Sequence, residues 1–354
     1  MNDRSYSPWL HRFAVLVVVA TFVVIISGGN VTSRGAGLAV PDGYRVFGHF
    51  LWTFPMDHWV GNIFHEHIHR LKGSVIGLLI VVLAVWLFLS QSKRPWLRLV
   101  GLITLAMVLI QGMMCAARVD RLSTTYAIIH GIHAQIILCM TVWIAAATGR
   151  TWQRRGPATD GPSYTNGLRR GSILLLAVLL VQLVLGALVR HHGAALAIPD
   201  FPGHYGSLLP PFTQAGIEAA HDAIVPYDRS PTNYPTPAQV SVHFAHRVWA
   251  LFVLATAVWL ITRLSARAAS DPALMRPSVA LASLLIVQVA FGVAVIASGR
   301  HPQLATAHQA TGAAILATAV LLMIRLLALR PLGADQTDPR PAPQAVSVLQ
   351  ESTA

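Results

Sequence analysis

The chain contains eight apolar segments that are each long enough to cross a lipid bilayer. They lie at residues 13–31, 66–89, 96–117, 124–147, 171–189, 240–261, 278–297 and 304–327. A helix needs about 20 mainly apolar residues to span the hydrocarbon core. Because 54% of the 354 residues are hydrophobic and only 11% are charged, the composition does not suit a soluble domain. Backbone polar groups must be satisfied inside the bilayer, so the sequence predicts an all-α polytopic membrane protein with eight transmembrane helices.

The basic residues are distributed unevenly between the two sides of the membrane. A net charge of +12 would suggest nucleic acid as a partner of a soluble protein. Here Arg and Lys instead gather at one set of span ends, as at Lys93, Arg150 and Arg263, and are sparser in the longer loops of the other side. By the positive-inside rule, both termini are predicted to be cytoplasmic, with the lipid bilayer and no nucleic acid as partner.

The chain also repeats itself. The segment from Gly28 to Asp42 recurs from Gly186 to Asp200, with a shift of about 158 residues. Further on, His69-Arg70 recurs as His246-Arg247 and His130 as His308, with shifts of about 177 and 178, so about 19 residues are inserted in the second large outer loop. Each unit holds four spans. We therefore expect two tandem four-helix bundles related by a pseudo-twofold axis along the membrane normal.

The repeat sets the expected domain boundaries. The N-terminal half occupies residues 1–150 and the C-terminal half residues 171–330, joined by a cytoplasmic linker at 151–170. Residues 331–354 are polar and rich in proline, so we expect a disordered cytoplasmic tail.

Four histidines lie near the outer ends of the second, fourth, sixth and eighth spans: His69, His130, His246 and His308. At 1.5 Å rise per residue, all four lie within about 10 Å of one another in height. Polar side chains inside a bilayer are costly and mark functional sites. Imidazoles at equal depth on facing helices can clamp a flat macrocycle from both faces, as in four-helix bundles that hold haem. The alternative ligand His133 lies one turn after His130, although the repeat spacing favours His130.

The segment from His65 to His69 also matches the H-E-x-x-H pattern, which can bind zinc with Glu66 as the base. An intramembrane zinc metalloprotease is therefore an alternative. The second half has His243 where the first has Glu66, and no third carboxylate ligand is obvious in another span, so this alternative is secondary.

These motifs together resemble the haem A synthase family. The resemblance rests on Glu66-x-x-His69-Arg70, on His130, on His246-Arg247, on His308-Gln309, and on the two outer-loop segments that end in Pro41-Asp42 and Pro199-Asp200. It covers nearly the whole chain apart from the tail. The family implies an eight-helix enzyme of the bacterial cytoplasmic (inner) membrane that oxidises the C8 methyl of haem O to the formyl group of haem A for terminal oxidases. Haem O synthase and terminal oxidase assembly factors are the implied partners, and a homo-oligomer is left open.

The resemblance also assigns roles to the site residues. His69 and His130 would hold the substrate haem O and the product haem A, whereas His246 and His308 would hold a resident haem b. Glu66 lies about one turn before His69, so a carboxylate on the same helix face can accept protons and serve as the catalytic group. Arg70 and Arg247 follow the ligands directly and are expected to bind haem propionates or lipid headgroups.

The chain departs from many bacterial members of the family at one point. Its outer loops contain no cysteine, and Cys115 and Cys139 both fall in apolar spans. A mechanism that needs an outer-loop disulfide is therefore excluded for this chain. A membrane electron-transfer subunit with two b haems and no chemistry of its own is the leading alternative function.

Overall fold

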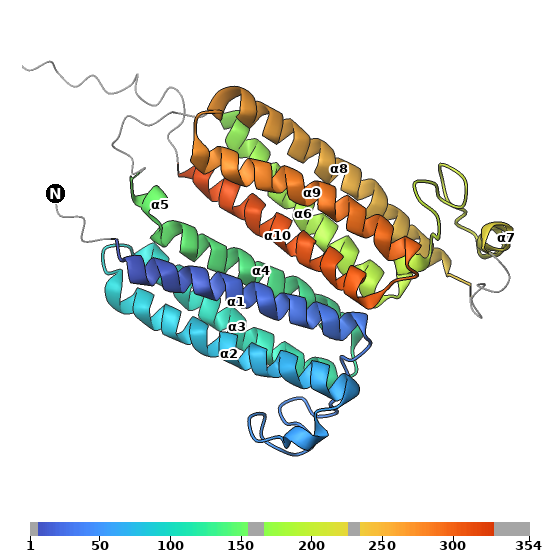
Figure 1. Cartoon of the computed structure of the whole chain (residues 1–354), viewed down its shortest axis with the longest axis horizontal. Coiled ribbons are helices and arrows are strands. Elements are labelled where there is room, and N and C mark those ends of the chain that lie inside the picture. Colours follow the sequence, from blue (N-terminus) through green and yellow to red (C-terminus); the bar gives the residue numbers. More distant parts are fainter. Residues whose placement is uncertain (1–5, 155–165, 226–233, 329–354) are drawn as a thin grey trace, which may run out of the picture.

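The computed structural model describes residues 6–154, 166–225 and 234–328, and within these ranges the protein is helical (Figure 1). Eight of its helices are long and apolar enough to cross a membrane, which confirms the predicted number of spans. Every one is longer than its predicted segment. The additional residues lie at one or both ends of each helix. The eight are α1 (Pro8–Ser33), α2 (Gly61–Ser90), α3 (Pro95–Asp120), α4 (Thr124–Thr148), α6 (Asn166–His191), α8 (Pro237–Ala268), α9 (Pro272–Ala297) and α10 (Pro302–Leu327).

Local sequence signals fix where these helices begin. A proline occupies the first turn of α1, α3, α8, α9 and α10, where its missing N–H costs no hydrogen bond. Ser7, Ser123 and Asp271 cap the first turns of α1, α4 and α9 with their side-chain oxygens. Thr236 and Gln239 form a capping box at the start of α8.

The helices form two groups of four (Figure 1). In the first group α1 packs against α2 and α4, and α3 packs against α2 and α4. In the second group α6 packs against α8 and α10, and α9 packs against α8 and α10. Across the seam between the groups, α10 contacts α1 and α4, and α4 contacts α6.

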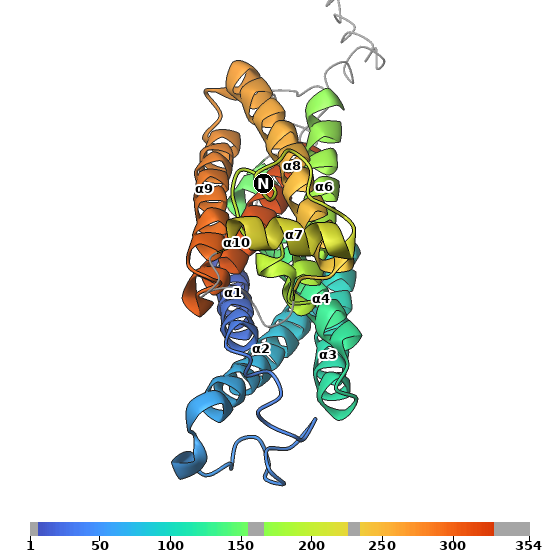
Figure 2. The same ribbon diagram turned by 90° about the vertical axis from the view of Figure 1, so that its right-hand side faces the viewer.

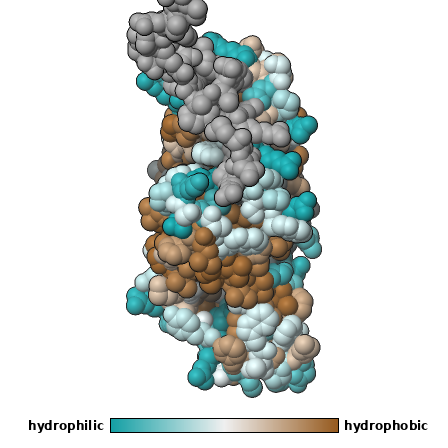
Figure 3. Space-filling view, turned by 90° about the vertical axis from the view of Figure 1, so that its left-hand side faces the viewer, coloured by the Kyte–Doolittle hydropathy of each residue, from teal (hydrophilic) through white to brown (hydrophobic). Residues whose placement is uncertain are grey.

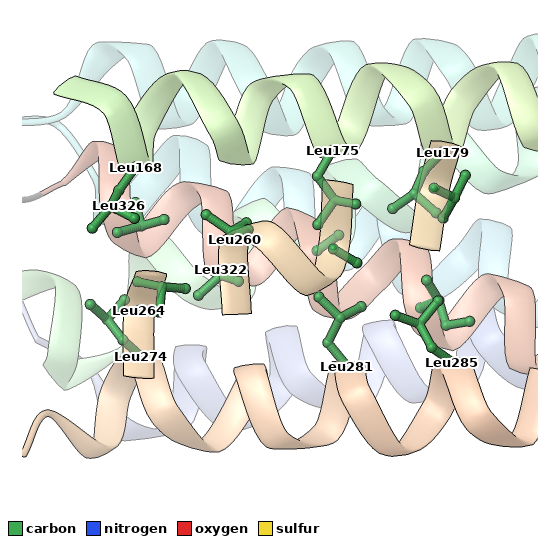
Figure 4. Packing of buried hydrophobic residues seen from close by; sticks show 14 of the residues in the cluster. Leu168, Leu175, Leu179, Leu260, Leu264, Leu274, Leu281, Leu285, Leu322 and Leu326 are labelled. Carbon is green, nitrogen blue, oxygen red and sulfur yellow. The ribbon is translucent and has the colours of Figure 1, made fainter. Parts of the chain in front are cut away.

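Each group has its own leucine-rich core. In the second group Leu175 of α6, Leu260 of α8, Leu281 of α9 and Leu322 of α10 point toward one another and are buried (Figure 4). A separate cluster joins Leu138 of α4 to residues of α10 across the seam. Large apolar side chains are also exposed along the outer faces of the helices, which suits contact with lipid rather than water.

The loops at one end of the molecule are longer than those at the other. The first long loop contains a short 3₁₀ helix, η1 (Met56–His58), and the second contains η2 (Ala194–Leu196) and α7 (Gln214–Ile224). Helix α7 lies across this end of the second group (Figure 2). It belongs to the longer second loop, where the sequence predicts the insertion.

The predicted linker and tail are described only in part. Helix α5 (Arg150–Arg154) and the first residues of α6 fall within the linker predicted at 151–170, and residues 155–165 lie outside the described residues. The tail predicted at 331–354 lies wholly outside them.

Candidate active site

The structure places one predicted histidine pair in each half of the molecule. His69 lies on α2 and His130 on α4 of the first group, and His246 lies on α8 and His308 on α10 of the second. All four residues fall in the first three turns of their helices, at the end of the molecule that carries the long loops. Each half of the protein therefore presents two imidazoles from different helices at a similar depth.

Glycines of neighbouring helices lie against three of these rings. A Cβ atom on Gly28 of α1 would lie 2.9 Å from His69 Cε1, and one on Gly186 of α6 would lie 3.2 Å from His246 Cε1. A Cβ atom on Gly292 of α9 would lie 3.3 Å from the same ring atom of His308. Any side chain at Gly28 would therefore displace the imidazole of His69.

A glutamine on the preceding helix contacts the second histidine of each pair. Gln111 Nε2 lies 3.2 Å from His130 Nε2, and Gln288 Nε2 lies 3.3 Å from His308 Nε2. His133 Nδ1 donates to Gln111 Oε1 at 2.7 Å. His133 thus holds the glutamine that faces His130, which favours His130 over His133 as the ligand.

The first histidine of each pair is held differently in the two halves. Gln182 Nε2 lies 3.1 Å from His246 Nδ1 and donates to the His246 carbonyl at 3.1 Å. The repeat places Val24, which cannot donate a hydrogen bond, at the corresponding position of the first half. Among the described residues, the buried Nδ1 of His69 has no hydrogen-bond partner.

Glu66 is buried beneath the first long loop, with 4% of its surface exposed. The backbone N–H of Val40 donates to Glu66 Oε2 at 2.9 Å, and Arg70 Nε lies 3.4 Å from Glu66 Oε1. Both carboxylate oxygens therefore bind the loop or the arginine that supports it.

His243 takes the same place in the second half. Its Nδ1 lies 3.3 Å from the backbone nitrogen of Ile198, which is the repeat counterpart of Val40, and its Nε2 lies 3.2 Å from Arg247 Nε. A neutral imidazole carries one N–H and accepts at only one ring nitrogen at a time, whereas a carboxylate accepts at both oxygens. Glu66 can therefore satisfy both neighbours together, and His243 only one.

Arg70 and Arg247 support the long loops. Arg70 donates to the carbonyls of Asp42 at 2.7 Å and Arg45 at 2.9 Å. Arg247 donates to the carbonyls of Asp200 and Ile198, each at 2.9 Å. Propionate binding by these arginines remains a prediction; in the structure they contact backbone carbonyls and the side chains of Glu66 and His243.

Asp200 closes the turn that Arg247 contacts. Its carboxylate accepts from the backbone N–H groups of Tyr205 at 2.7 Å and Gly206 at 2.9 Å. Burial raises the pKa of Asp200, but these two hydrogen bonds and the charge of Arg247 outweigh it, so the pKa lies below its ordinary value.

Arg190, at the end of α6, joins the two halves beside the histidines. It donates to Gln309 Oε1 of α10 at 2.7 Å and to Ser33 Oγ of α1 at 2.6 Å, and also to the carbonyl of Gly29. Gln309 directly follows His308, and Gly29 follows the glycine that packs against His69. The Arg190 guanidinium thus links segments that adjoin both histidine pairs.

The protease pattern is not assembled as a metal site. His65 Nδ1 lies 3.4 Å from Asn30 Nδ2, and Glu66 is bound to Val40 and Arg70. Within residues 6–154, 166–225 and 234–328 there is no group of three His, Cys, Asp or Glu side chains that could hold a metal ion. The geometry does not favour a zinc protease.

Sequence reasoning missed several contacts around the site. It did not single out Arg190 or Gln182. Gln182 could have been found as a lone amide in an otherwise apolar run. The partners of Arg190 carry no such signal, because they depend on how α1 packs against α10.

Comparison with known proteins supports the family indicated by the sequence. The chain matches the COX15-CtaA family, described as cytochrome oxidase assembly protein, over residues 11–320. A Beijerinckia indica relative named haem A synthase is 27% identical over 325 residues, which cover 82% of this chain and 84% of the relative. Relatives of the same name from Methylobacterium radiotolerans and Rhodopseudomonas palustris are 28% and 30% identical, over 96% and 78% of this chain and 94% and 73% of their own lengths. This eight-span protein, with its paired histidines, therefore belongs to the cytochrome oxidase assembly family that includes the haem A synthases.

Proposed function

We propose that this protein is a haem A synthase, an oxidoreductase that converts the C8 methyl of haem O to the formyl group of haem A. Family membership over most of the chain supports the reaction. The observation that carries the proposal is the presence of two matched histidine pairs, one in each half, within the first three turns of helices that begin at the same end of the molecule.

The residues present suit haem. Each pair offers imidazoles from two helices, and the buried Nδ1 atoms of His69 and His130 have no hydrogen-bond partner within residues 6–154, 166–225 and 234–328. Gly28, Gly186 and Gly292 keep side chains away from the rings. We assign the substrate haem O to His69 and His130, and a resident haem b to His246 and His308. When bound, the resident haem would supply single-electron transfer.

The two halves differ in a way that matches this assignment. Among the described residues, Gln182 and Gln288 both contact the second pair, whereas Gln111 is the one glutamine that contacts the first. Hydrogen bonds to a ligand histidine fix its ring orientation. A more firmly held pair suits a resident group, and a less constrained His69 suits a substrate that must enter and leave.

Glu66 is the proposed catalytic residue. Oxidation of a methyl to a formyl group releases protons, and Glu66 is the carboxylate on the helix of His69, one turn away. Its oxygens bind Val40 N–H and face Arg70 Nε, so the carboxylate is held in one position and can accept a proton there. Arg70 and Arg247 are proposed to contact propionates with the N–H groups that the loop carbonyls leave free.

The proposal extends to the symmetry, location and partners of the protein. The matched packing of α1–α4 and of α6, α8, α9 and α10 supports a pseudo-twofold relation between the halves. We place the protein in the bacterial inner membrane with both termini cytoplasmic, and we propose haem O synthase and oxidase assembly factors as its partners.

A pair of substitutions tests the role of Glu66. Glu66→Gln keeps an acceptor for Val40 N–H but removes the proton acceptor, and Glu66→His copies the residue of the second half. We expect both variants to retain their haems and to form haem A at least about a hundredfold more slowly, as measured by chromatography of extracted haems. Wild-type haem A formation by either variant would refute the catalytic assignment.

A further inference from the structure

A cavity of about 540 Å³ lies at the end of the molecule opposite the histidine pairs. It is formed by α1 and α4 of the first half, by α5, and by α10 of the second half. It therefore lies at the seam between the halves and uses none of the residues assigned to haem or to proton transfer.

The membrane-surface end of this cavity is basic. Tyr6, His11, Arg150 and Arg325 line it, and no Asp or Glu is among its lining residues in the described part of the chain. The Arg150 guanidinium lies 4.9 Å from the centre of the Tyr6 ring, and Arg325 Nη1 donates to the carbonyl of Ala273 at 2.6 Å. These contacts hold two positive charges at the rim.

The deeper part of the cavity is apolar. Val15 and Val18 of α1, Val142 of α4 and Leu321 of α10 line it. From His11 to Val18 the helix α1 advances about 10 Å at 1.5 Å per residue. The cavity thus changes from a charged rim to an apolar interior over a distance suited to a headgroup and part of an acyl chain. Seen from this end, hydrophobic residues lie in the middle of the molecular surface, between hydrophilic margins (Figure 3).

We propose that this cavity binds one anionic phospholipid. Arg150 and Arg325 would bind the phosphate, and an acyl chain would lie between α1 and α10. Basic pockets between transmembrane helices at a membrane surface select anionic headgroups. Because the cavity walls come from both halves, the lipid would bridge the seam and stabilise their packing.

Native mass spectrometry can test the site on the full-length protein. The protein is reconstituted in nanodiscs of phosphatidylglycerol and phosphatidylcholine in equal amounts, then released and weighed. We expect one retained phosphatidylglycerol per chain, with no displacement by millimolar inorganic phosphate. Equal retention of both lipids, or displacement by free phosphate, would overturn the proposal.

Substitutions locate the lipid. Replacing both rim residues, as Arg150→Gln with Arg325→Gln, should weaken retention by about fivefold for each charge. Ala317→Phe, which fills the cavity without changing charge, should also reduce retention. The matched control is Arg12→Gln, since Arg12 stacks over Trp9 at 5.1 Å and does not line the cavity. Wild-type retention in both the double variant and Ala317→Phe would contradict the site, with circular dichroism confirming that each variant is folded.

Discussion

The two halves of the protein use different residues for the same structural task. Glu66 in the first half and His243 in the second both face a loop N–H, from Val40 or Ile198, and the Nε of an arginine. The carboxylate can accept from both neighbours at once and forms a hydrogen bond with Val40 N–H and an ion pair with Arg70, whereas a neutral imidazole can accept from only one. The second half makes the same loop contact with His243, so this contact alone does not require a carboxylate. This difference is why we assign chemistry to Glu66 and a structural role to His243.

The largest expected effect separates the two haem sites. His246→Ala should lower haem b content at least tenfold and leave the first site able to bind haem O, because each pair belongs to its own four-helix group. His69→Ala should do the reverse. Haem extraction and chromatography measure both contents. If either substitution removed both groups equally, the sites would not be independent.

The next effect concerns the contact between the halves. Arg190→Gln removes the donors to Gln309, Ser33 and Gly29, which should destabilise the protein by about 1–3 kcal/mol because partly buried acceptors lose their partner. Arg300→Gln is the matched control, since Arg300 is exposed in the loop before α10. Thermal unfolding in detergent measures the loss. Equal melting temperatures of the two variants would show that the contacts of Arg190 between the halves do not stabilise the protein.

A smaller effect tests how the halves hold their first histidine. Gln182→Val makes the second half like the first and should weaken haem b retention by about 0.5–1.5 kcal/mol. The reciprocal Val24→Gln should slow release of the haem held by His69. Dissociation is followed by transfer to an excess of apomyoglobin. Unchanged rates in both variants would show that the glutamine does not distinguish the sites.

The smallest expected effect is a pH-dependent contribution of Asp200, in the second long loop, to the stability of the protein. The pKa of Asp200 is lowered in the folded protein, so its contribution to stability is present above the unfolded pKa of about 4 and is lost as pH falls through the lower folded value. Asp200→Asn should abolish this loss of stability at acidic pH. Melting temperatures measured between about pH 6 and pH 3 test it, and parallel curves for both proteins would argue against the contribution.

Much of this architecture could be predicted from local patterns. Apolar length predicts the eight transmembrane helices, and the four-span repeat places His69 and His130 in one half and His246 and His308 in the other. These features depend on residues close in sequence or on fixed helical rise. The helix ends were less predictable, because Pro8 and Asn166 begin helices in polar surroundings.

The remaining contacts depend on tertiary packing. The hydrogen bond between Val40 N–H and Glu66 requires the first long loop to fold back over α2, and no local motif specifies that path. Likewise, Arg190 donates hydrogen bonds to both Gln309 and Gly29 because α1 of one half packs against α10 of the other. Arg70 was predicted to bind propionates, and the loop carbonyls that it contacts could not be foreseen from its position beside His69.

The most direct test is the haem content of the purified protein. A reduced-minus-oxidised spectrum, combined with chromatography of the extracted haems, should show one haem b per chain together with haem O or haem A. Addition of haem O to active membranes should increase the haem A fraction. Two equivalents of haem b with no haem O or haem A would instead indicate an electron-transfer subunit, and stoichiometric zinc without haem would contradict the account entirely.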